Sequence, residues 1–306
     1  MRLAGIDCGT NSIRLLVADA TPSDGLVDVV REMRIVRLGQ GVDRTGRLAP
    51  DALERTRVAL HEYAATIRSL ETDRVRMVAT SATRDASNRS EFVQMVEAEL
   101  GVAPEVITGD EEARLSYAGA IASLLAAEGR VLVTDIGGGS TELVLGEGAR
   151  VTNSISMDIG CVRMTERHLR DDPPTAEQVA RTVDDLHEAI AAAARVVPIR
   201  TADTFVGVAG TVTTIAAIAL GLERYDADAI HGSVISAAQI AEVTDRLLRM
   251  THDERAALPV MHPGRVDVIG GGALVLRTLV EESGAAEVMA SEHDILDGIT
   301  LSLLTA

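Results

Sequence analysis

The chain has 306 residues, about the length of two average domains, and a formal net charge of −17, which excludes nucleic-acid binding through a broad basic face. All 29 residues counted as lysine or arginine are arginine, and the absence of lysine excludes a Walker-type phosphate loop, a kinase-type phosphate lysine and Schiff-base chemistry. A polyanionic ligand would have to be bound by arginine, by metal and by backbone amides.

The N-terminal stretch combines an apolar run with a loop that begins with an acidic residue. Residues 3–6 predict a buried strand, and the sequence DCGTNS follows at Asp7 to Ser12. Glycine leaves room for a phosphate to reach backbone N–H groups, and Asp7 can hold a metal ion that binds the phosphate. Two further apolar runs, 13–18 and 26–38, predict a second and a third strand.

After the third strand, apolar residues recur at helical spacing and predict a helix over 50–70. A short buried strand is predicted over 74–80. This strand continues into the loop ATSATRDASN, residues 79–88, which is rich in hydrogen-bond donors. Open α/β sheets bind ligands at the carboxyl ends of their strands, so the loop is a candidate ligand site. The alternative is a polar surface loop that ends in a helix cap at Ser90.

An acidic segment opens the next helix. After a predicted helix over 90–100 and a short strand over 105–108, the sequence GDEEARLSYAG occupies 109–119. The helix dipole favours acidic residues at a helix start, which gives the carboxylates at 110–112 a purely structural explanation. The functional alternative is that one of them is a general base. Residues 120–129 are expected to complete this helix and to join the two halves.

The second half begins with TDIGGGSTE, residues 134–142, between two apolar runs that predict strands. Three glycines remove the Cβ atoms that would keep a phosphate from the backbone, and Ser140 and Thr141 add hydroxyl donors. Asp135 can hold a Mg²⁺ ion that binds the phosphate. The alternative is a glycine-rich hairpin turn preceded by an ordinary acidic residue.

This loop repeats the N-terminal one. The acid, the first glycine and the serine stand at the same relative offsets in both loops, at Asp7, Gly9 and Ser12 and at Asp135, Gly137 and Ser140. Each loop is followed by two more apolar runs before helix-period sequence begins. The chain therefore predicts two copies of one supersecondary unit, whose loops could hold one polyanion and one cation across a cleft.

Five helices and two glycine turns are predicted in the remaining sequence. Gly160 to Arg163 opens the first helix, and Thr175 with Gln178 forms a capping box for a helix that ends near residue 196. Strands at 205–208 and 266–269 each lead into a glycine turn and then a helix, at 212–220 and 273–282. Gly210 and Thr211 lie in the first of these turns and repeat the logic of the phosphate loop. A C-terminal helix is predicted over 294–304.

Six segments, in this order, resemble the exopolyphosphatase and guanosine pentaphosphate phosphohydrolase family of the actin-like ATPase superfamily. They are DCGTNSIR at 7–14, ATSATRDASN at 79–88, GDEEARLSYAG at 109–119, DIGGGSTEL at 135–143, GVAGTVTT at 207–214 and RVDVIGGGA at 265–273. The resemblance implies an α/β fold of two ribonuclease-H-like domains with an interdomain active-site cleft. The first would span 1–125, with a C-terminal helix at 292–306 packed on it, and the second 126–291.

The resemblance also implies roles for individual residues. Glu112 matches the family's catalytic base, and Asp135 and Glu142 match its catalytic and metal-binding acids. Most of the predicted phosphate-binding residues lie in the two glycine loops. They are Asn11, Ser12, Arg84, Asn88, Gly137, Gly138, Gly139, Ser140, Thr141, Gly210 and Thr211. The predicted metal ligands are Asp135, Glu142 and Asp7, and the implied cofactor is Mg²⁺ or Mn²⁺.

The activity implied by the resemblance is removal of the terminal phosphate of inorganic polyphosphate. Many family members carry a further helical domain, and this chain stops at Ala306, so we expect a preference for short chains. Asp297 and Gly298 stand where the family often has glutamate before glycine, which leaves the role of Asp297 open. The alternatives are a guanosine pentaphosphate phosphohydrolase, a non-hydrolysing actin-like nucleotide-binding regulator, and a member that has lost activity and senses phosphate or nucleotide.

The remaining expectations concern location and partners. Two cysteines are too few for a disulfide framework, no apolar run approaches the length of a membrane span, and charged residues interrupt the N-terminal apolar stretch. These features predict a cytoplasmic protein without membrane contact. Polyphosphate or a phosphorylated guanosine nucleotide is the expected partner, nucleic acid is not, and the family suggests a homodimer.

Overall fold

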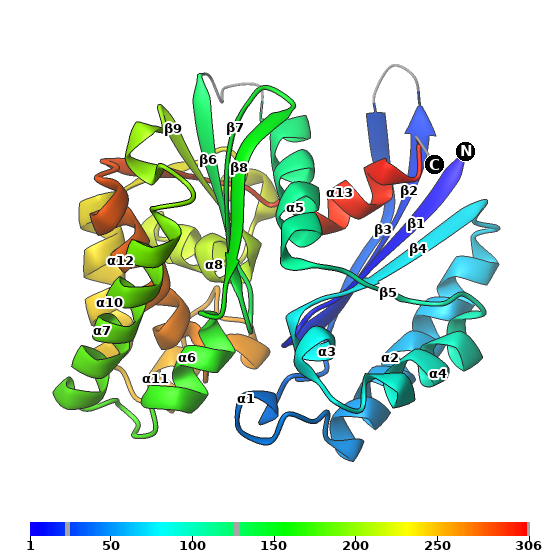
Figure 1. The fold of residues 1–306 in the computed structure, drawn as a ribbon, viewed down its shortest axis with the longest axis horizontal. Coiled ribbons are helices and arrows are strands. Elements are labelled where there is room, and N and C mark those ends of the chain that lie inside the picture. The colour runs from blue at the N-terminus through cyan, green and yellow to red at the C-terminus, as the bar shows by residue number, and fades with distance from the viewer. Residues whose placement is uncertain (22–24, 125–128, 305–306) are drawn as a thin grey trace. The chain divides into compact units, whose positions relative to one another are not determined.

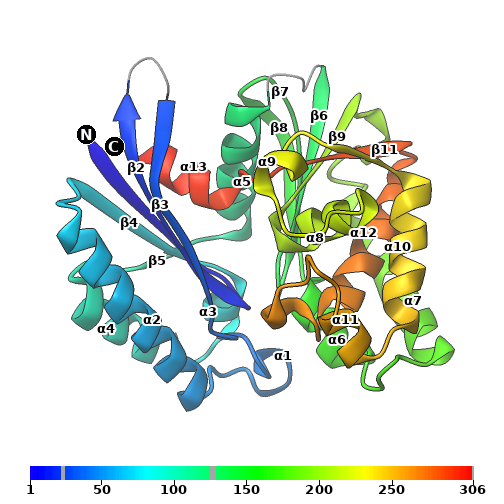
Figure 2. The same cartoon turned by 180° about the vertical axis from the view of Figure 1, so that it is seen from behind.

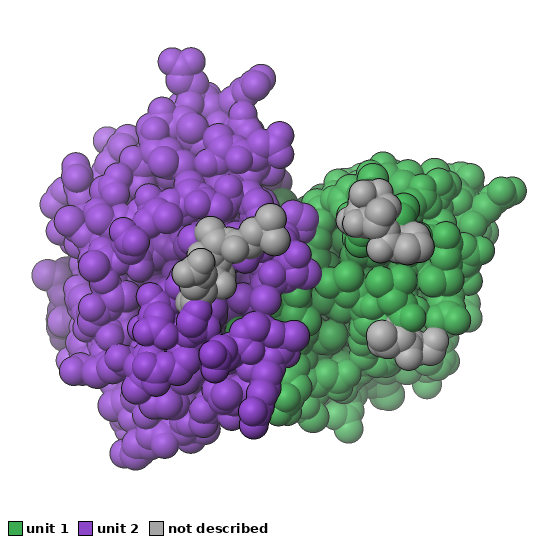
Figure 3. All heavy atoms as spheres, turned by 90° about the horizontal axis from the view of Figure 1, so that it is seen from above, with its two compact units in different colours: residues 1–119, 295–306 green, residues 120–294 purple. Residues whose placement is uncertain are grey.

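The computed structural model describes residues 1–21, 25–124 and 129–304, which form two compact units (Figure 3). Unit 1 comprises Met1–Gly119 and Ile295–Ala306, and unit 2 comprises Ala120–Asp294. The division falls within helix α5 (Gly109–Ser123) rather than after residue 125, and the C-terminal segment of unit 1 begins at Ile295 rather than at 292.

Unit 1 is built on a five-stranded sheet with the order β3-β2-β1-β4-β5. The strands are β1 (Arg2–Cys8), β2 (Ser12–Thr21), β3 (Gly25–Ile35), β4 (Arg74–Ala79) and β5 (Glu105–Val106). Strands β1, β4 and β5 are parallel, whereas β2 is antiparallel to both β1 and β3. This order and these directions are those of a ribonuclease-H-like domain, as predicted.

Helices cover both faces of this sheet (Figure 1). They are α1 (Val42–Thr45), α2 (Pro50–Ser69), α3 (Ser81–Asp85), α4 (Arg89–Leu100), α5 and α13 (Ile295–Ser302). Tyr63 of α2 and Phe92 of α4 are fully buried in the core on one face, and Ile299 of α13 is buried on the other. The predicted irregular loop at 79–88 is wrong in part, because Ser81–Asp85 is helical. Helix α5 ends at Ser123, so its predicted extension is wrong at residue 124, and 125–128 lie outside the described residues.

Helix α13 packs closely on the rest of unit 1, and glycine makes this possible. A Cβ atom on Gly298 would lie 2.0 Å from the backbone oxygen of Leu115, and one on Gly5 would lie 2.2 Å from Oγ1 of Thr300. Asp297 accepts a hydrogen bond of 2.5 Å from Nη2 of Arg31 on β3. The structure thus explains Asp297 and Gly298 as the residues that join α13 to the sheet and to α5.

We expect Gly298→Ala to destabilise the protein by about 3 kcal/mol, because backbone atoms of Leu115 cannot move aside as a side chain would. The midpoint of thermal unfolding should fall by about 6–12 °C. Gly270→Ala is the matched control, since its added methyl would meet only a side-chain atom of Leu248 at 3.4 Å. Equal midpoints for Gly298→Ala and the unaltered protein would contradict the close packing of α13.

Unit 2 repeats this sheet and adds one strand, in the order β10-β11-β9-β6-β7-β8. The strands are β6 (Arg130–Ile136), β7 (Thr141–Glu147), β8 (Arg150–Met157), β9 (Thr204–Val208), β10 (Val234–Ser236) and β11 (Glu287–Ala290). Strands β6, β9 and β11 are parallel, and the remaining three are antiparallel to their neighbours. The predicted duplication of a supersecondary unit is therefore confirmed (Figure 2).

One large aliphatic core holds the helices of unit 2 on its sheet. The helices are α6 (Cys161–His168), α7 (Ala176–Ala193), α8 (Ala209–Ala219), α9 (Ala227–Ile230), α10 (Ala237–Arg249), α11 (His252–Ala256) and α12 (Ile269–Ser283). The capping box of Thr175 and Gln178 at the start of α7 is confirmed. Among the described residues, no helix is both long and apolar enough to cross a membrane.

The two predicted glycine turns of unit 2 are wrong. Helix α8 begins at Ala209, directly after β9, and residues 266–269 form no strand but lead into α12. The glycines of α12 serve helix packing, because a Cβ on Gly271 would lie 2.6 Å from Oγ1 of Thr165. A Cβ on Gly272 would lie 2.5 Å from Oγ1 of Thr211. A glycine run in a helix interface and a glycine turn look alike in sequence.

Candidate active site

In unit 1 the candidate residues lie at the carboxyl edge of the sheet. Cys8 pairs with Ala79 and Ala79 with Val106, so the segments that follow β1, β4 and β5 emerge together. Hydroxyl oxygens of Thr10 and Ser81 are 2.9 Å apart there. The predicted residues Asn11 and Ser12 lie in the loop after β1, where the carbonyl of Ser12 accepts a 3.0 Å hydrogen bond from the Gly9 amide.

Asp7, near the end of β1, is neutralised by an arginine. Its cross-strand neighbour on β2 is Arg14, whose Nε and Nη2 donate to Oδ2 of Asp7 at 3.0 and 2.6 Å. Both donors meet Oδ2, so the other carboxylate oxygen, Oδ1, lies outside this contact. The assignment of Asp7 as a metal ligand stays a prediction.

Glu112 and Arg84 form a buried pair. Glu112 lies in the first turn of α5 and is 7% exposed, and its Oε2 accepts from Nη1 of Arg84 at 2.9 Å. The same Nη1 donates to the carbonyl of Ile107 at 3.2 Å, which fixes the guanidinium on the β5 end. A guanidinium carries five N–H donors, so Arg84 can orient Glu112 and still donate to a phosphate.

The adjacent carboxylate has a different environment. Glu111 is half-exposed and pairs with Nη2 of Arg76 at 2.9 Å, and Arg76 also donates to Oγ of Ser302. Glu111 is therefore part of an ion-pair network between α5, β4 and α13, which is the structural role that its place at a helix start suggests. Of the three acidic residues at this helix start, Glu112 is the buried one.

Asn88 has a structural role that the sequence did not indicate. Its Oδ1 accepts from the amide of Leu48 at 2.9 Å, and its Nδ2 donates to the carbonyl of Leu48 at 3.1 Å. Both ends of the buried amide are thus engaged by the backbone of a segment 40 residues away. The prediction that Asn88 binds phosphate is not supported by this geometry, and we assign it to holding two loops together.

In unit 2 the loop over 137–140 has the same backbone turn as its counterpart in unit 1, with a 3.0 Å hydrogen bond from the Gly137 amide to the Ser140 carbonyl. The carbonyl of Gly138 accepts from the Val162 amide at 2.9 Å, and that of Gly139 accepts from Nε of Arg163 at 2.6 Å. In the described part of the chain, no group accepts from the amides of Gly138 and Gly139. Two adjacent N–H groups in a glycine loop are what an anion site needs.

Gly160 is a site residue whose role the sequence analysis missed. A Cβ atom there would lie 2.4 Å from the carbonyl oxygen of Gly138 and 2.7 Å from the carbonyl carbon of Gly139. Any larger residue would displace the phosphate loop. The sequence signal was present as a glycine directly after the third strand, but it was interpreted only as a helix start.

The two hydroxyl residues of the loop differ. Thr141 is fully buried, and its hydroxyl donates to the carbonyl of Ile159, so it is not available to a phosphate. This overturns the prediction for Thr141. Ser140 is also buried, and no atom of the described residues forms a side-chain hydrogen bond with it. It remains a candidate phosphate ligand.

Asp135 and Glu142 are directly opposite each other on β6 and β7. Their exposed fractions are 6% and 1%, and Oγ of Ser156 on β8 donates to Oε1 of Glu142 at 2.7 Å. Cross-strand partners point to the same face with Cβ atoms about 5 Å apart, and two like charges there repel. In unit 1 the position equivalent to Glu142 holds Arg14, which removes this conflict; in unit 2 a divalent cation would remove it.

The donor set fits a hard cation. Two carboxylates and a hydroxyl offer only oxygen, which Mg²⁺ and Mn²⁺ prefer. No cluster of three or more His, Cys, Asp or Glu residues suited to a metal occurs in residues 1–21, 25–124 and 129–304. A cation held here would therefore complete its shell with water and phosphate oxygens, as Mg²⁺ commonly does.

The start of α8 adds a second backbone feature and an arginine. Ala209 has a φ of 67°, a strained value for a residue other than glycine. The guanidinium of Arg265 lies against Gly210, where a Cβ would come within 2.4 Å of its Nη2, and its Nη1 donates to Oγ1 of Thr214 at 2.9 Å. Gly210 therefore makes room for the guanidinium of Arg265. The sequence analysis did not identify Arg265 as a site residue.

The neighbouring cysteine is not a nucleophile. Burial raises the pKa of the Cys161 thiol to about 11, although a hydrogen bond with Thr211 acts in the opposite direction. Cys8 follows Asp7 and is also buried, and burial raises its pKa further. Both thiols are protonated at neutral pH, so no thiolate is available for covalent catalysis. Thr211 is buried beside this thiol, and its assignment to phosphate binding stays a prediction.

The chain is similar to known proteins over nearly its whole length. A model of the Ppx/GppA phosphatase family matches residues 16–306. Exopolyphosphatase 2 of Mycobacterium tuberculosis is 54% identical over 99% of this chain and 98% of its own length. The bifunctional 3-dehydroquinate synthase/phosphatase of Fusobacterium nucleatum is 32% identical over 97% of this chain and 46% of its own length.

Solved structures show the same similarity. The crystal structure of an exopolyphosphatase-like protein has a TM-score of 0.95 and 47% identity, covering 100% of this chain and 99% of that one. A Ppx/GppA family member from Aquifex aeolicus has a TM-score of 0.83 and 35% identity, with coverage of 100% and 98%. On these matches, the chain belongs to the Ppx/GppA phosphatase family.

Proposed function

We propose that this protein is an exopolyphosphatase that hydrolyses the terminal phosphoanhydride bond of inorganic polyphosphate and releases orthophosphate. The observation that carries the proposal is the pair of buried carboxylates, Asp135 and Glu142, on the strands that flank the available amides of Gly138 and Gly139. This arrangement suits a phosphate bound together with a divalent cation. Family membership and the name of the M. tuberculosis relative support the choice of substrate.

The roles of the residues follow from their chemistry. Glu112, oriented by Arg84, accepts a proton from the water that attacks the terminal phosphorus. The bridging P–O bond then breaks, and the shortened chain leaves with the bridging oxygen. The amides of Gly138 and Gly139 bind phosphate oxygens, and Asp135 with Glu142 would hold the cation. A bound Mg²⁺ or Mn²⁺ ion, which we propose as cofactor, supplies positive charge to the transferred group.

Several further proposals rest on the resemblance. Glu112 belongs to unit 1 and Asp135 to unit 2, and their joint action on one substrate is proposed from the resemblance alone. A preference for short chains and a homodimeric state are proposed on the same basis. A cytoplasmic location is proposed because both cysteines are free and buried, which suits a reducing compartment.

The experiment that tests the proposal is phosphate release by the purified protein with Mg²⁺. Short-chain polyphosphate, long-chain polyphosphate, guanosine pentaphosphate and ATP are compared at equal concentrations of terminal phosphate. We expect release from polyphosphate, with the short chain preferred. Faster release from guanosine pentaphosphate would replace the proposed substrate by the nucleotide. Tight binding without release would instead assign the protein to a sensor or a nucleotide-binding regulator.

A further inference from the structure

The segment over 36–48 extends the phosphate loop of unit 1. The Gly39 amide donates to the carbonyl of Thr10 at 2.8 Å, and the Arg37 amide donates to that of Asn11 at 2.9 Å. A Cβ atom on Gly39 would lie 2.3 Å from Cγ2 of Thr10, so glycine allows the two segments to touch. The segment is thus fixed to the loop that is proposed to bind phosphate.

The other end of this segment is fixed to the start of α4. The carbonyl of Gly46 accepts from both the amide and the hydroxyl of Ser87, each at 2.9 Å. Asn88 and the backbone of Leu48 add the two hydrogen bonds described above. Arg44 and Arg47 flank Gly46 on one side of this junction, and Arg89 follows Asn88 on the other. Three arginines therefore gather at one place, which we call the arginine rim.

The rim is exposed and its charges are only weakly engaged. In the part of the chain that the structure describes, neither Arg44 nor Arg89 has a carboxylate partner. Arg47 approaches Glu91 at 3.4 Å, and both side chains are more than half exposed. Exposed pairs of this kind contribute less than about 1 kcal/mol and exchange partners easily.

Several arginines elsewhere in unit 1, although not Arg68, have a close carboxylate partner. Arg57, which represents the common case, pairs with both Glu54 and Glu99 at 2.8 and 2.9 Å. In a chain with a net charge of −17, exposed arginines without such partners are positions at which an anion gains attraction. The acidic residues on the same segments, Asp43, Asp85 and Glu91, make the rim mixed in charge, which favours weak and reversible contacts over tight ones.

We propose that Arg44, Arg47 and Arg89 bind the phosphates of the polyphosphate chain that follow the one being removed. The inference deepens the proposed function and rests on it. Successive phosphates carry repeated charge, so exposed guanidinium groups with weak partners can hold them without fixing one register. The contribution of the rim grows with the number of phosphates that reach it, and the rim therefore sets how activity depends on chain length.

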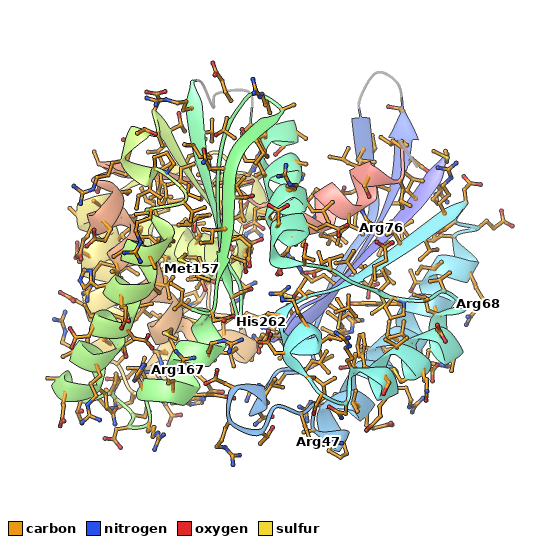
Figure 4. All side chains as sticks on the ribbon, viewed as in Figure 1. Arg47, Arg68, Arg76, Met157, Arg167 and His262 are labelled. Carbon is orange, nitrogen blue, oxygen red and sulfur yellow. The ribbon has the colours of Figure 1, made fainter. Side chains whose placement is uncertain are left out.

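The test compares inorganic triphosphate with long-chain polyphosphate in Arg44→Ala, Arg89→Ala and the double variant. We expect kcat/KM for the long chain to fall by about threefold for each change and about tenfold for both, and to fall far less for triphosphate. Arg68→Ala is the matched control. Arg68 is also exposed, but it lies near the end of α2, about 27 Å along the helix axis from Pro50 at its start. Figure 4 shows Arg68 well separated from Arg47.

A binding measurement separates this inference from the proposed function. Binding of long-chain polyphosphate is measured in the Glu112→Gln background, with and without the two rim changes, over a range of salt concentrations. We expect the rim changes to weaken binding and to flatten its dependence on salt. Unaltered binding and an unaltered ratio of long-chain to triphosphate activity would overturn the rim and leave the exopolyphosphatase standing. Binding that depends on the rim, without hydrolysis, would overturn the proposed function alone.

Discussion

Replacement of Glu112 by glutamine should lower phosphate release by about 10²- to 10⁴-fold while the protein stays folded. Glutamine has the shape of glutamate, and its Oε1 can still accept the hydrogen bond from Nη1 of Arg84 that now measures 2.9 Å. It cannot take a proton from water. The effect should therefore appear in kcat with polyphosphate, while circular dichroism and the midpoint of thermal unfolding change little.

The neighbouring residue is the control for this prediction. Glu111→Gln makes the same chemical change one position earlier on the same helix, where the side chain pairs with Arg76 instead. It should retain most of the activity. Activity that survives Glu112→Gln but is lost in Glu111→Gln would move the base to Glu111. Equal losses in both would indicate that the helix start, and not one carboxylate, is what turnover requires.

The dependence of activity on pH is a second readout in the same experiment. A general base acts only in its deprotonated form, so a reaction that uses Glu112 should slow on the acidic side. If Glu112 is the base, the acidic limb of the profile of kcat/KM against pH should disappear in Glu112→Gln. A limb that persists in this variant belongs to another group.

The parts of this protein that could be predicted are those with a local signal. In two glycine loops, each after an apolar run, the acid, the first glycine and the serine have the same spacing. This repeat predicted the duplicated sheet that the structure contains. Hydrophobic periodicity and a local capping box predicted helices such as α2 and α7. In these cases the residues that determine the structure lie within a few positions of one another, and the sequence displays their spacing directly.

The unsupported or open assignments concern side chains whose partners are distant in sequence. Asn88 and Thr141 have the right chemistry for binding phosphate, but their hydrogen bonds go to Leu48 and Ile159, 40 and 18 positions away. Asp297 is paired with Arg31, 266 positions away. A polar residue in a motif is recognisable from one sequence, whereas whether the fold has already used its hydrogen bonds is not.

The strongest test of the metal site is Glu142→Gln, because it predicts opposite changes in stability and activity. Glu142 lies opposite Asp135 in a buried position, and two ionised carboxylates there repel each other. The amide removes one charge and can still accept from Ser156 at the position of Oε1. In a chelator, the variant should be more stable than the unaltered protein by up to about 1 kcal/mol.

With the cation the order should reverse. Mg²⁺ or Mn²⁺ should raise the midpoint of thermal unfolding of the unaltered protein but not that of Glu142→Gln, since a ligand stabilises only the fold that binds it. Turnover in the variant should fall by at least about 100-fold. Glu147→Gln, on the exposed end of the same strand, is the control and should respond to the cation as the unaltered protein does. Equal stabilisation of Glu142→Gln and the unaltered protein by the cation would place the metal elsewhere, and the buried pair would then need a shared proton instead.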